Sequence, residues 1–289
     1  MRRLTAAALL LACAACVREP DPLEFTEPAF SVHGVVRAGE TAVRVSLLRT
    51  LARGAPSETS GAEVTLSSGA TTVRLTEVPG SQPGACYTPD FSPVESPLRG
   101  CYAATLPQPA APGSRWQLTA TLPAGEKATG STVIPAPPAI LSPAPGTRLV
   151  VSSRGFEAAE FDVAWQTPSA PRVEIRVAEG TAFRDGARVQ GSTCMVAHRH
   201  VEAAVGQPSG SRRMYVDGVF CYHGPGGEMA WDSAVVPVLV TAFDSAYADF
   251  ALHGRGVTRG HRSAALQGAY GVFGSAASTR REIIVIPRR

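Results

Sequence analysis

The stretch WQLTATL at residues 116–122 decides the fold, because apolar and polar side chains alternate along it without a break. A period of two places every second side chain on the same face, which is typical of a half-buried β-strand. The same alternation recurs at 43–47, 62–66, 73–75, 161–165 and 173–177, and turn residues such as Ser68-Gly69 and Pro112-Gly113 separate some of these runs. No helical period intervenes, so the pattern predicts an all-β chain built as antiparallel sandwiches.

Two stretches depart from alternation and refine this expectation. Residues 235–243 are nearly all apolar, which indicates a strand buried on both faces, with Pro237 marking an edge or a bulge. Asp244 and Ser245 then form a helix cap, and residues 246–252 fit one or two helical turns that end at Gly254. An apolar run at 283–286 predicts a closing strand. We expect two β-sandwich-like domains in tandem, with one short helix near 244–252.

A proline-rich segment at 135–146 is the best candidate for a domain boundary. Proline has no N–H to donate to a sheet, so we expect an extended, stiff linker at this place. It would separate an N-terminal β-sandwich domain at 29–134 from a C-terminal β-rich domain at 147–289.

The N-terminus has the features of a lipoprotein signal peptide. Arg2 and Arg3 precede an apolar run at 4–15, which is shorter than the roughly 20 residues that span a bilayer. The run ends in LACAAC, where small residues precede a cysteine that a lipoprotein peptidase would expose. We predict a signal peptide at 1–15, lipidation of Cys16 and a tether at 16–28, with Cys13 as the alternative. The residue directly after Cys16 is not an aspartate, so we expect the outer membrane, on either its periplasmic or its surface face.

The remaining cysteines suggest disulfides, because an exported chain reaches an oxidising compartment. After cleavage before Cys16, four remain besides the lipidated one, and three pairings are possible. Neighbours in sequence share a domain most simply, so we favour Cys86–Cys101 and Cys194–Cys221. The formal net charge is only +3, and no clustered basic face of the kind that binds nucleic acid is evident.

The order of several short motifs resembles a family of Gram-negative envelope lipoproteins known as domain of unknown function four-two-four-nine. The motifs are the N-terminal LACAAC, GAEVTL at 61–66, GSRWQL at 113–118 with GSTVIP at 130–135, residues 238–250, and GAYGVFG at 268–274. The N-terminal half also resembles transthyretin-like and fibronectin-like sandwiches. The resemblance implies an envelope location and, for partners, association with outer-membrane transport proteins, and it brings no catalytic residues. The segments 86–101 and 194–221 and the alanine-rich composition depart from the family pattern.

The sharpest candidate for chemistry is a histidine cluster. His198 and His200 would lie on the same face of a strand, and a Cys194–Cys221 bridge would bring His223 near them. With Glu202 or Glu228 they could hold zinc, and the chain would then be a metal-dependent hydrolase. The plainer interpretation is that these histidines are exposed polar residues in a disulfide-linked hairpin.

A second alternative is a glycan-binding module, in which Tyr215, Tyr222 and Trp231 form an aromatic loop near residues 224–227. No phosphate-binding loop, HExxH motif, calcium-binding loop or serine-nucleophile elbow is present in the sequence. We therefore expect no cofactor and no catalytic site. The leading hypothesis is an outer-membrane lipoprotein that acts as a non-enzymatic binding or accessory module.

Overall fold

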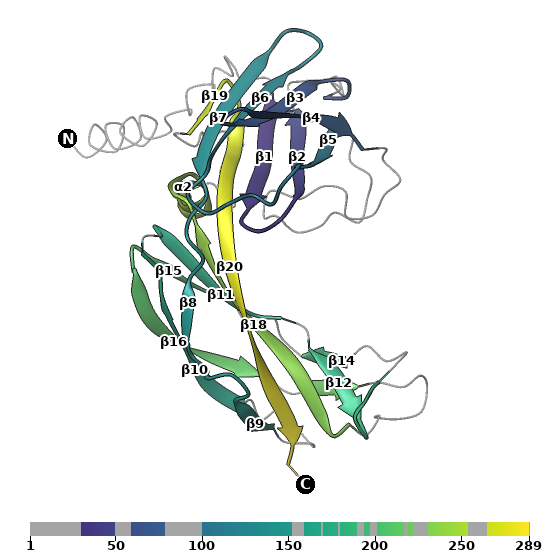
Figure 1. Ribbon diagram of the computed structural model, residues 1–289, viewed down its shortest axis with the longest axis vertical. Coiled ribbons are helices and arrows are strands. Elements are labelled where there is room, and N and C mark those ends of the chain that lie inside the picture. The colour runs from purple at the N-terminus through teal and green to yellow at the C-terminus, as the bar shows by residue number, and fades with distance from the viewer. Residues whose placement is uncertain are drawn as a thin grey trace, which may run out of the picture.

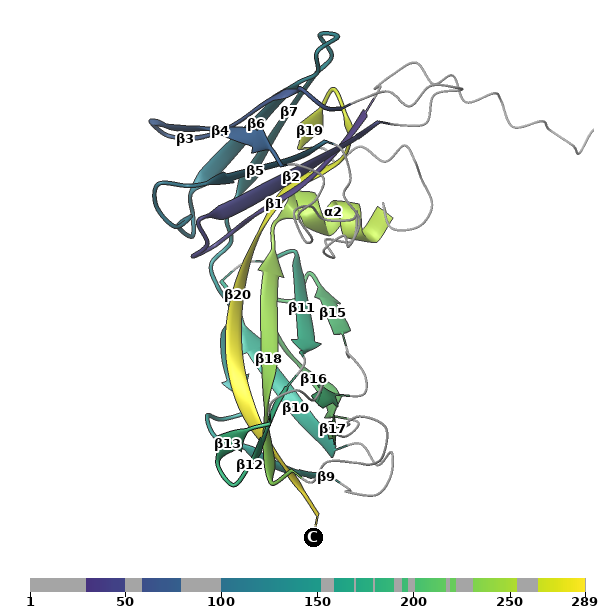
Figure 2. The ribbon, with the colours of Figure 1, turned by 90° about the vertical axis from the view of Figure 1, so that its right-hand side faces the viewer.

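The computed structural model describes residues 30–49, 59–78, 100–151, 159–168, 170–178, 180–189, 194–196, 201–216, 219–221, 231–253 and 265–288. The prediction of an all-β fold with one short helix is confirmed. Two sandwich-like units lie end to end, and the strand β20 (Tyr270–Pro287) runs lengthwise through both of them (Figures 1 and 2). The helix α2 (Ser245–His253) lies where the units meet, as the cap at Asp244 predicted.

The first unit is built from eight strands of its own and part of β20. In chain order these are β1 (Phe30–Arg37), β2 (Ala42–Arg49), β3 (Glu63–Ser68), β4 (Thr71–Glu77), β5 (Cys101–Thr105), β6 (Arg115–Thr121), β7 (Lys127–Val133) and, much later, β19 (Leu266–Gln267). One sheet has the order β20-β1-β2-β5, and the other has the order β4-β3-β6-β7-β19. The end of β4 also pairs with the first half of β5 and joins the two sheets.

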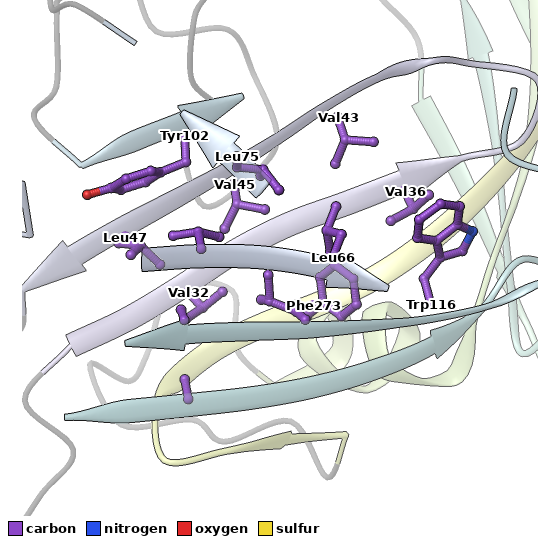
Figure 3. Close-up of a cluster of buried hydrophobic side chains, with 14 of the residues drawn as sticks. Val32, Val36, Val43, Val45, Leu47, Leu66, Leu75, Tyr102, Trp116 and Phe273 are labelled. Carbon is purple, nitrogen blue, oxygen red and sulfur yellow. The ribbon is translucent and has the colours of Figure 1, made fainter. Parts of the chain in front are cut away.

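The core of the first unit lies between these sheets (Figure 3). The stretch that decides the fold is β6, in which Trp116, Leu118 and Ala120 are buried while Arg115 and Gln117 are exposed. Their buried partners include Leu66 on β3 and side chains of β1, β2 and β5. The period of two in the sequence is therefore the division between core and solvent.

The second unit has two sheets and a separate ribbon. Its strands are β8 (Ala139–Ser142), β9 (Arg148–Val151), β10 (Ala159–Gln166), β11 (Arg172–Val177), β12 (Thr181–Arg184), β13 (Ala187–Arg188), β14 (Cys194–Val196), β15 (Val201–Val205), β16 (Ser209–Val216), β17 (Val219–Cys221) and β18 (Ser233–Phe243). One sheet has β18 at its centre, flanked on one edge by β11 and β12 and on the other by β20, with β15, β13 and β9 outside these. The three-stranded sheet β16-β10-β8 faces it across the second core, and β14 and β17 form the ribbon.

Strand β20 is far longer than the expected strand at 283–286. Its first part pairs with β1 in parallel, from Ser31–Tyr270 to Arg37–Ala276. Its second part pairs with β18 in antiparallel register, from Phe243–Ala276 to Ala234–Val285. Residues 278–282, within this second part, have no fully buried side chain, which is why the sequence gives no apolar signal there.

This strand changes how the chain is divided between the two cores. Leu266, Ala269 and Phe273 fall in the region expected to form the C-terminal domain at 147–289, yet they lie in the core of the first unit. Gly130 on β7 makes room for this packing, because a Cβ there would meet Phe273 Cβ at 3.0 Å. The first core therefore uses both the beginning and the end of the described chain.

The segment expected as the 135–146 linker contains the strand β8, which pairs with β10 at the edge of the three-stranded sheet. The expectation of no ladder here was wrong, because residues 139–142 carry no proline and their N–H groups are available. Thr279 donates a hydrogen bond to the carbonyl of Pro138, and Arg281 donates one to that of Ile140. The segment is thus tied to the middle of β20.

Pro237 lies within β18 at a position where its missing N–H faces a gap between two neighbouring strands. Its carbonyl accepts a hydrogen bond from Ala178 N–H, so its own nitrogen points to that same edge and away from β20. On that edge β12 pairs with residues up to Val235 and β11 pairs from Val238 onward. The missing N–H therefore falls between two partner strands and costs no ladder bond.

Candidate functional site

Most residues singled out for chemistry lie outside the described part of the chain. These are the lipidation candidates Cys13 and Cys16, the histidines His198, His200 and His223, and Tyr222. Among the residues that the structure does describe, no group of three or more His, Cys, Asp or Glu side chains could hold a metal ion. No helix in the described ranges is long and apolar enough to cross a membrane.

The aromatic loop is described only at its ends. Tyr215 lies on β16 with part of its surface exposed, while Trp231 packs against the second core. Tyr222 and residues 224–227 lie outside the described residues, so the aromatic loop stays a prediction.

The four cysteines expected in disulfides are described unevenly. Cys101 at the start of β5 is buried and disulfide-bonded. Its expected partner Cys86 lies outside the described residues, so that pairing stays a prediction. The backbone of Cys194 in β14 is directly opposite that of Cys221 in β17, which is the register that a cross-strand bridge between them would need.

The outward surface of the three-stranded sheet is the best candidate for a binding face. We define the outer face as the exposed residues Glu160, Asp162 and Gln166 of β10, Ser209, Ser211 and Arg213 of β16, and Ala139 and Leu141 of β8. They project away from the core because β10 and β16 alternate strictly, with Phe161, Val163 and Trp165 buried on the inner side. Tyr215 stands opposite Glu160 at one end of this face.

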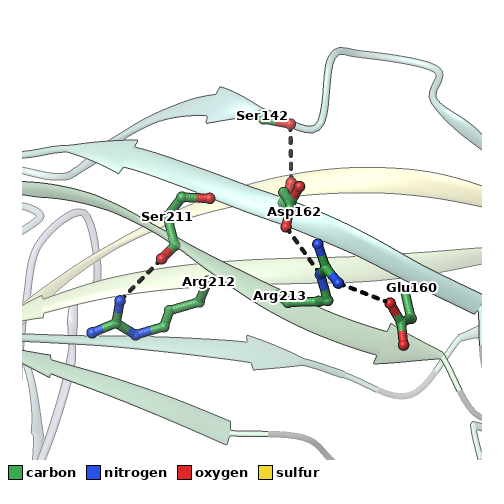
Figure 4. Close-up of polar contacts among 6 residues, drawn as sticks. All are labelled: Ser142, Glu160, Asp162, Ser211, Arg212 and Arg213. Carbon is green, nitrogen blue, oxygen red and sulfur yellow. Dashed lines mark hydrogen bonds and ion pairs between the residues drawn. The ribbon is translucent and has the colours of Figure 1, made fainter.

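One arginine links the charges of the outer face (Figure 4). Arg213 Nη1 lies 3.4 Å from Glu160 Oε2, and Arg213 Nε lies 3.7 Å from Asp162 Oδ1. All three side chains are more than half exposed, at 63%, 53% and 61%, so these ion pairs add little to stability. Leu141 beside them is 61% exposed. An exposed sheet face with an arginine and a leucine, and with a tyrosine at one end, is suited to contact with another protein.

The inner side of the same sheet is closed. Trp165 is fully buried, Gly210 opposite it leaves room for the ring, and the Arg212 guanidinium lies 5.8 Å from the ring centroid. Arg212 donates to the carbonyl of Ser211, which holds it along the strand (Figure 4). The outer face is therefore backed by a rigid layer.

A second polar group, which we call the junction cluster, lies where the two units meet. It consists of Thr132 on β7, Asp244 before α2 and Ser275 on β20, all buried. Thr132 Oγ1 is 2.5 Å from Asp244 Oδ2 and 2.6 Å from Ser275 Oγ, and Ser275 Oγ donates to the carbonyl of Val133 at 2.9 Å. The N–H of Tyr247 donates to Asp244 Oδ1 at 3.0 Å, so Asp244 caps α2 as the sequence indicated.

Thr132 and Ser275 had no signal in the sequence, because each occupies an ordinary position in a strand and the two are 143 residues apart. Asp244 carried a signal only as a cap. The residues Glu160 and Asp162 could have been found from the alternation that exposes them, whereas their partner Arg213 required the pairing of β10 with β16.

No protein-family model matches the chain, and no curated protein matches its sequence. Among solved structures, the FN1–FN3 domains of chicken CNTN1 are 15% identical, with 91% of this chain and 68% of that chain covered and a TM-score of 0.26. The adhesin InvE of Yersinia pseudotuberculosis is 14% identical, with 88% and 60% covered and a TM-score of 0.23. TM-scores of this size carry no argument about the activity of this chain.

Proposed function

We propose that this chain is a lipid-anchored outer-membrane protein that acts as a non-enzymatic binding or accessory module. The observation that carries the proposal is the course of β20. The described chain enters the first unit at Phe30, beside Tyr270 at the start of β20, and that strand ends at Pro287 at the far end of the second unit. At about 3.3 Å per residue, its 18 residues span about 60 Å.

This geometry suits display of the second unit away from an anchor. A short tether from Cys16 would reach the first unit at the end where β1 and β20 both begin. The paired strand β20 resists bending, because it is hydrogen-bonded to β1 in one unit and to β18 in the other. The second unit would therefore be held away from the membrane, with its outer face exposed.

The outer face is the proposed contact for a protein partner in the same envelope, and an outer-membrane transport protein is the class that we favour. Its exposed carboxylates and guanidinium supply charges of both signs, and Tyr215 and Leu141 supply apolar area. Such faces gain specificity from charge complementarity more than from area alone.

The anchor is tested by metabolic labelling with a fatty-acid analogue in a Gram-negative host. We expect the wild-type chain and Cys13→Ala to be labelled and Cys16→Ala to lose the label. Labelling of Cys16→Ala together with loss in Cys13→Ala would move the anchor to Cys13. Equal, background labelling of all three chains would refute the anchor.

The binding face is tested by placing a photo-crosslinking residue at Ser211, with the exposed Gln117 of β6 in the first unit as the matched control. We expect an outer-membrane transport protein to be captured from Ser211 and not from Gln117. Charge reversal by Arg213→Glu should abolish the capture, whereas Arg74→Glu on the exposed side of β4 should not. Equal capture at both positions, or capture of lipid alone, would refute the outer face as the contact.

A further inference from the structure

The junction cluster joins every place where the described chain passes between the two units. The chain leaves the first unit after β7, where Thr132 lies, and returns to it after β18, where Asp244 lies. It passes to the second unit again along β20, and Ser275 is the residue just before the one that pairs with both β1 and β18. One side chain from each crossing therefore meets the others within hydrogen-bonding distance.

The contacts of the junction cluster need more protons than its two hydroxyl groups can supply. Three oxygen–oxygen contacts run in series: Asp244 Oδ2 to Thr132 Oγ1 at 2.5 Å, Thr132 Oγ1 to Ser275 Oγ at 2.6 Å, and Ser275 Oγ to the Val133 carbonyl at 2.9 Å. Each contact needs one proton between its oxygens, and a hydroxyl group has only one to give. With an ionised carboxylate, Thr132 and Ser275 supply two protons for three contacts, so one close oxygen pair is left without a proton.

The neutral carboxylic acid supplies the missing proton. Asp244 Oδ2–H then donates to Thr132, Thr132 donates to Ser275, and Ser275 donates to the Val133 carbonyl. The other oxygen, Oδ1, remains an acceptor for the Tyr247 N–H and keeps its role as the helix cap. Every polar atom in the series is satisfied in this arrangement, as a buried network requires.

We propose that Asp244 is held as the neutral acid, and that its proton completes a hydrogen-bond series which ties β7, α2 and β20 together at the junction of the two units. Loss of that proton would open one contact of the series and loosen the junction. The stiffness of the molecule between its two units would then follow pH.

The surroundings of Asp244 agree with this assignment. Burial raises the pKa of the Asp244 carboxyl above its ordinary value of 3.8, and hydrogen bonds from Thr132 and from backbone N–H groups oppose this shift only in part. Gly274 packs so closely that a Cβ there would lie 2.9 Å from Asp244 Oδ1, so the strand β20 seals the group from water.

No charged side chain accounts for the raised pKa. Strand β18 carries no titratable residue. The titratable residues on the other elements around Asp244 are His33 and Arg37 on β1, Lys127 on β7, Tyr247, Asp249 and His253 on α2, and Tyr270, Arg280, Arg281 and Glu282 on β20. The sign of the effect on folding follows from the raised pKa. The stabilisation is complete below the ordinary value of 3.8 and is lost as pH rises through the higher pKa of the folded protein.

The direct test is a carbon-13 NMR titration of aspartate carboxyl groups in the full chain, with Asp244 assigned from the Asp244→Asn variant. We expect the Asp244 signal to keep the shift of a neutral acid at pH values above about 4, the ordinary midpoint of an aspartate carboxyl. A midpoint for Asp244 near the ordinary value of about 4 would overturn the proposal.

The Ser275→Ala variant separates this role of the Asp244 proton from a merely structural hydrogen bond. Without Ser275 Oγ, the single Thr132 proton is free to donate to the carboxylate, so the ionised form is favoured. We expect the midpoint of Asp244 to fall by about one pH unit, the equivalent of one hydrogen bond. Ser278 lies on β20 like Ser275, and Ser278→Ala removes its exposed hydrogen bond to Thr241 on β18, so this control should leave the midpoint of Asp244 unchanged. An unchanged or raised midpoint of Asp244 in Ser275→Ala would refute the proposed role of its proton.

Discussion

The two units share one architecture but differ in where their strands come from and in what they bury. The first unit is completed by residues 266–276 from the far end of the chain, whereas the second is built from residues 139–243 and the last part of β20. The first unit buries the uncharged hydroxyl of Tyr102 among apolar side chains, while β11 of the second unit buries the ion pair Arg172–Glu174. The first unit therefore depends on a distant strand, and the second depends on a local pair of charges.

The largest effect should come from truncating buried side chains of β20 on either side of Ala276, where this strand passes from the first unit to the second. Phe273 is fully buried in the first core and Ile283 in the second, ten positions apart on one strand. We expect Phe273→Ala to cost about 4 kcal/mol and Ile283→Ala about 3 kcal/mol, because both leave cavities. Hydrogen exchange followed by mass spectrometry should show lost protection in β6 for Phe273→Ala and in β10 for Ile283→Ala. The same loss of protection in both variants would contradict the expectation that the two parts of β20 stabilise separate cores.

Next in size is the buried ion pair of the second unit. Arg172 Nε and Nη2 donate to Glu174 Oε1 at 3.0 and 2.9 Å, and both side chains are at most 10% exposed. Glu174→Leu leaves a guanidinium buried without its carboxylate and should cost about 3 kcal/mol in urea unfolding. The double variant Arg172→Met/Glu174→Leu should recover most of that loss. A double variant as unstable as the single one would show that the loss does not come from the unpaired Arg172 guanidinium.

The first unit has its own buried titratable group in His33 on β1. Its ring lies edge-on to Phe250 at 5.7 Å, its Nδ1 has no hydrogen-bond partner among the described residues, and burial lowers its pKa from 6.5 to about 4. The stabilisation is therefore complete above pH 6.5 and is lost as pH falls toward 4, by about 3 kcal/mol in total.

Urea unfolding of the wild type and of His33→Leu between these pH values checks the effect. The Leu variant, which cannot be protonated, should show a flatter profile in this range. Equal slopes for the two chains would place the acid sensitivity elsewhere. The dependence of stability on pH has the opposite sign for Asp244, so the junction around α2 is weakened both when pH falls and when it rises.

A smaller effect concerns a buried hydroxyl group inside the first core. The Tyr102 hydroxyl donates to the Thr59 carbonyl at 2.6 Å and accepts from the Ala62 N–H at 2.8 Å. Tyr102→Phe leaves both backbone groups unpaired and should cost about 2 kcal/mol, measured by urea unfolding. Arg213→Ala on the exposed outer face should change stability by less than about 0.5 kcal/mol. A loss from Arg213→Ala as large as that from Tyr102→Phe would contradict this ranking.

Much of the secondary structure could be predicted from local patterns, and the exceptions have physical causes. The strands β3, β6 and β10 follow from alternation, because one face of each meets a core and the other is at least partly open to solvent. Strands β2 and β11 also alternate in polarity, although Ser46 on β2 and Arg172 and Glu174 on β11 are buried. Strand β1 was missed because α2 covers the face that carries His33 and Val35, so both faces are buried and no alternation remains. The junction cluster could not be predicted, since its three residues meet only after the strands have paired.

The sequence by itself determined the all-β class, most of the strands and the cap of α2, because each of these depends on residues within one turn or one strand of each other. The tertiary structure alone decided that β20 belongs to both units and that Thr132, Asp244 and Ser275 share one buried network. Pairing between strands more than a hundred residues apart depends on which faces complement each other in space. No pattern within a short window of sequence records that choice.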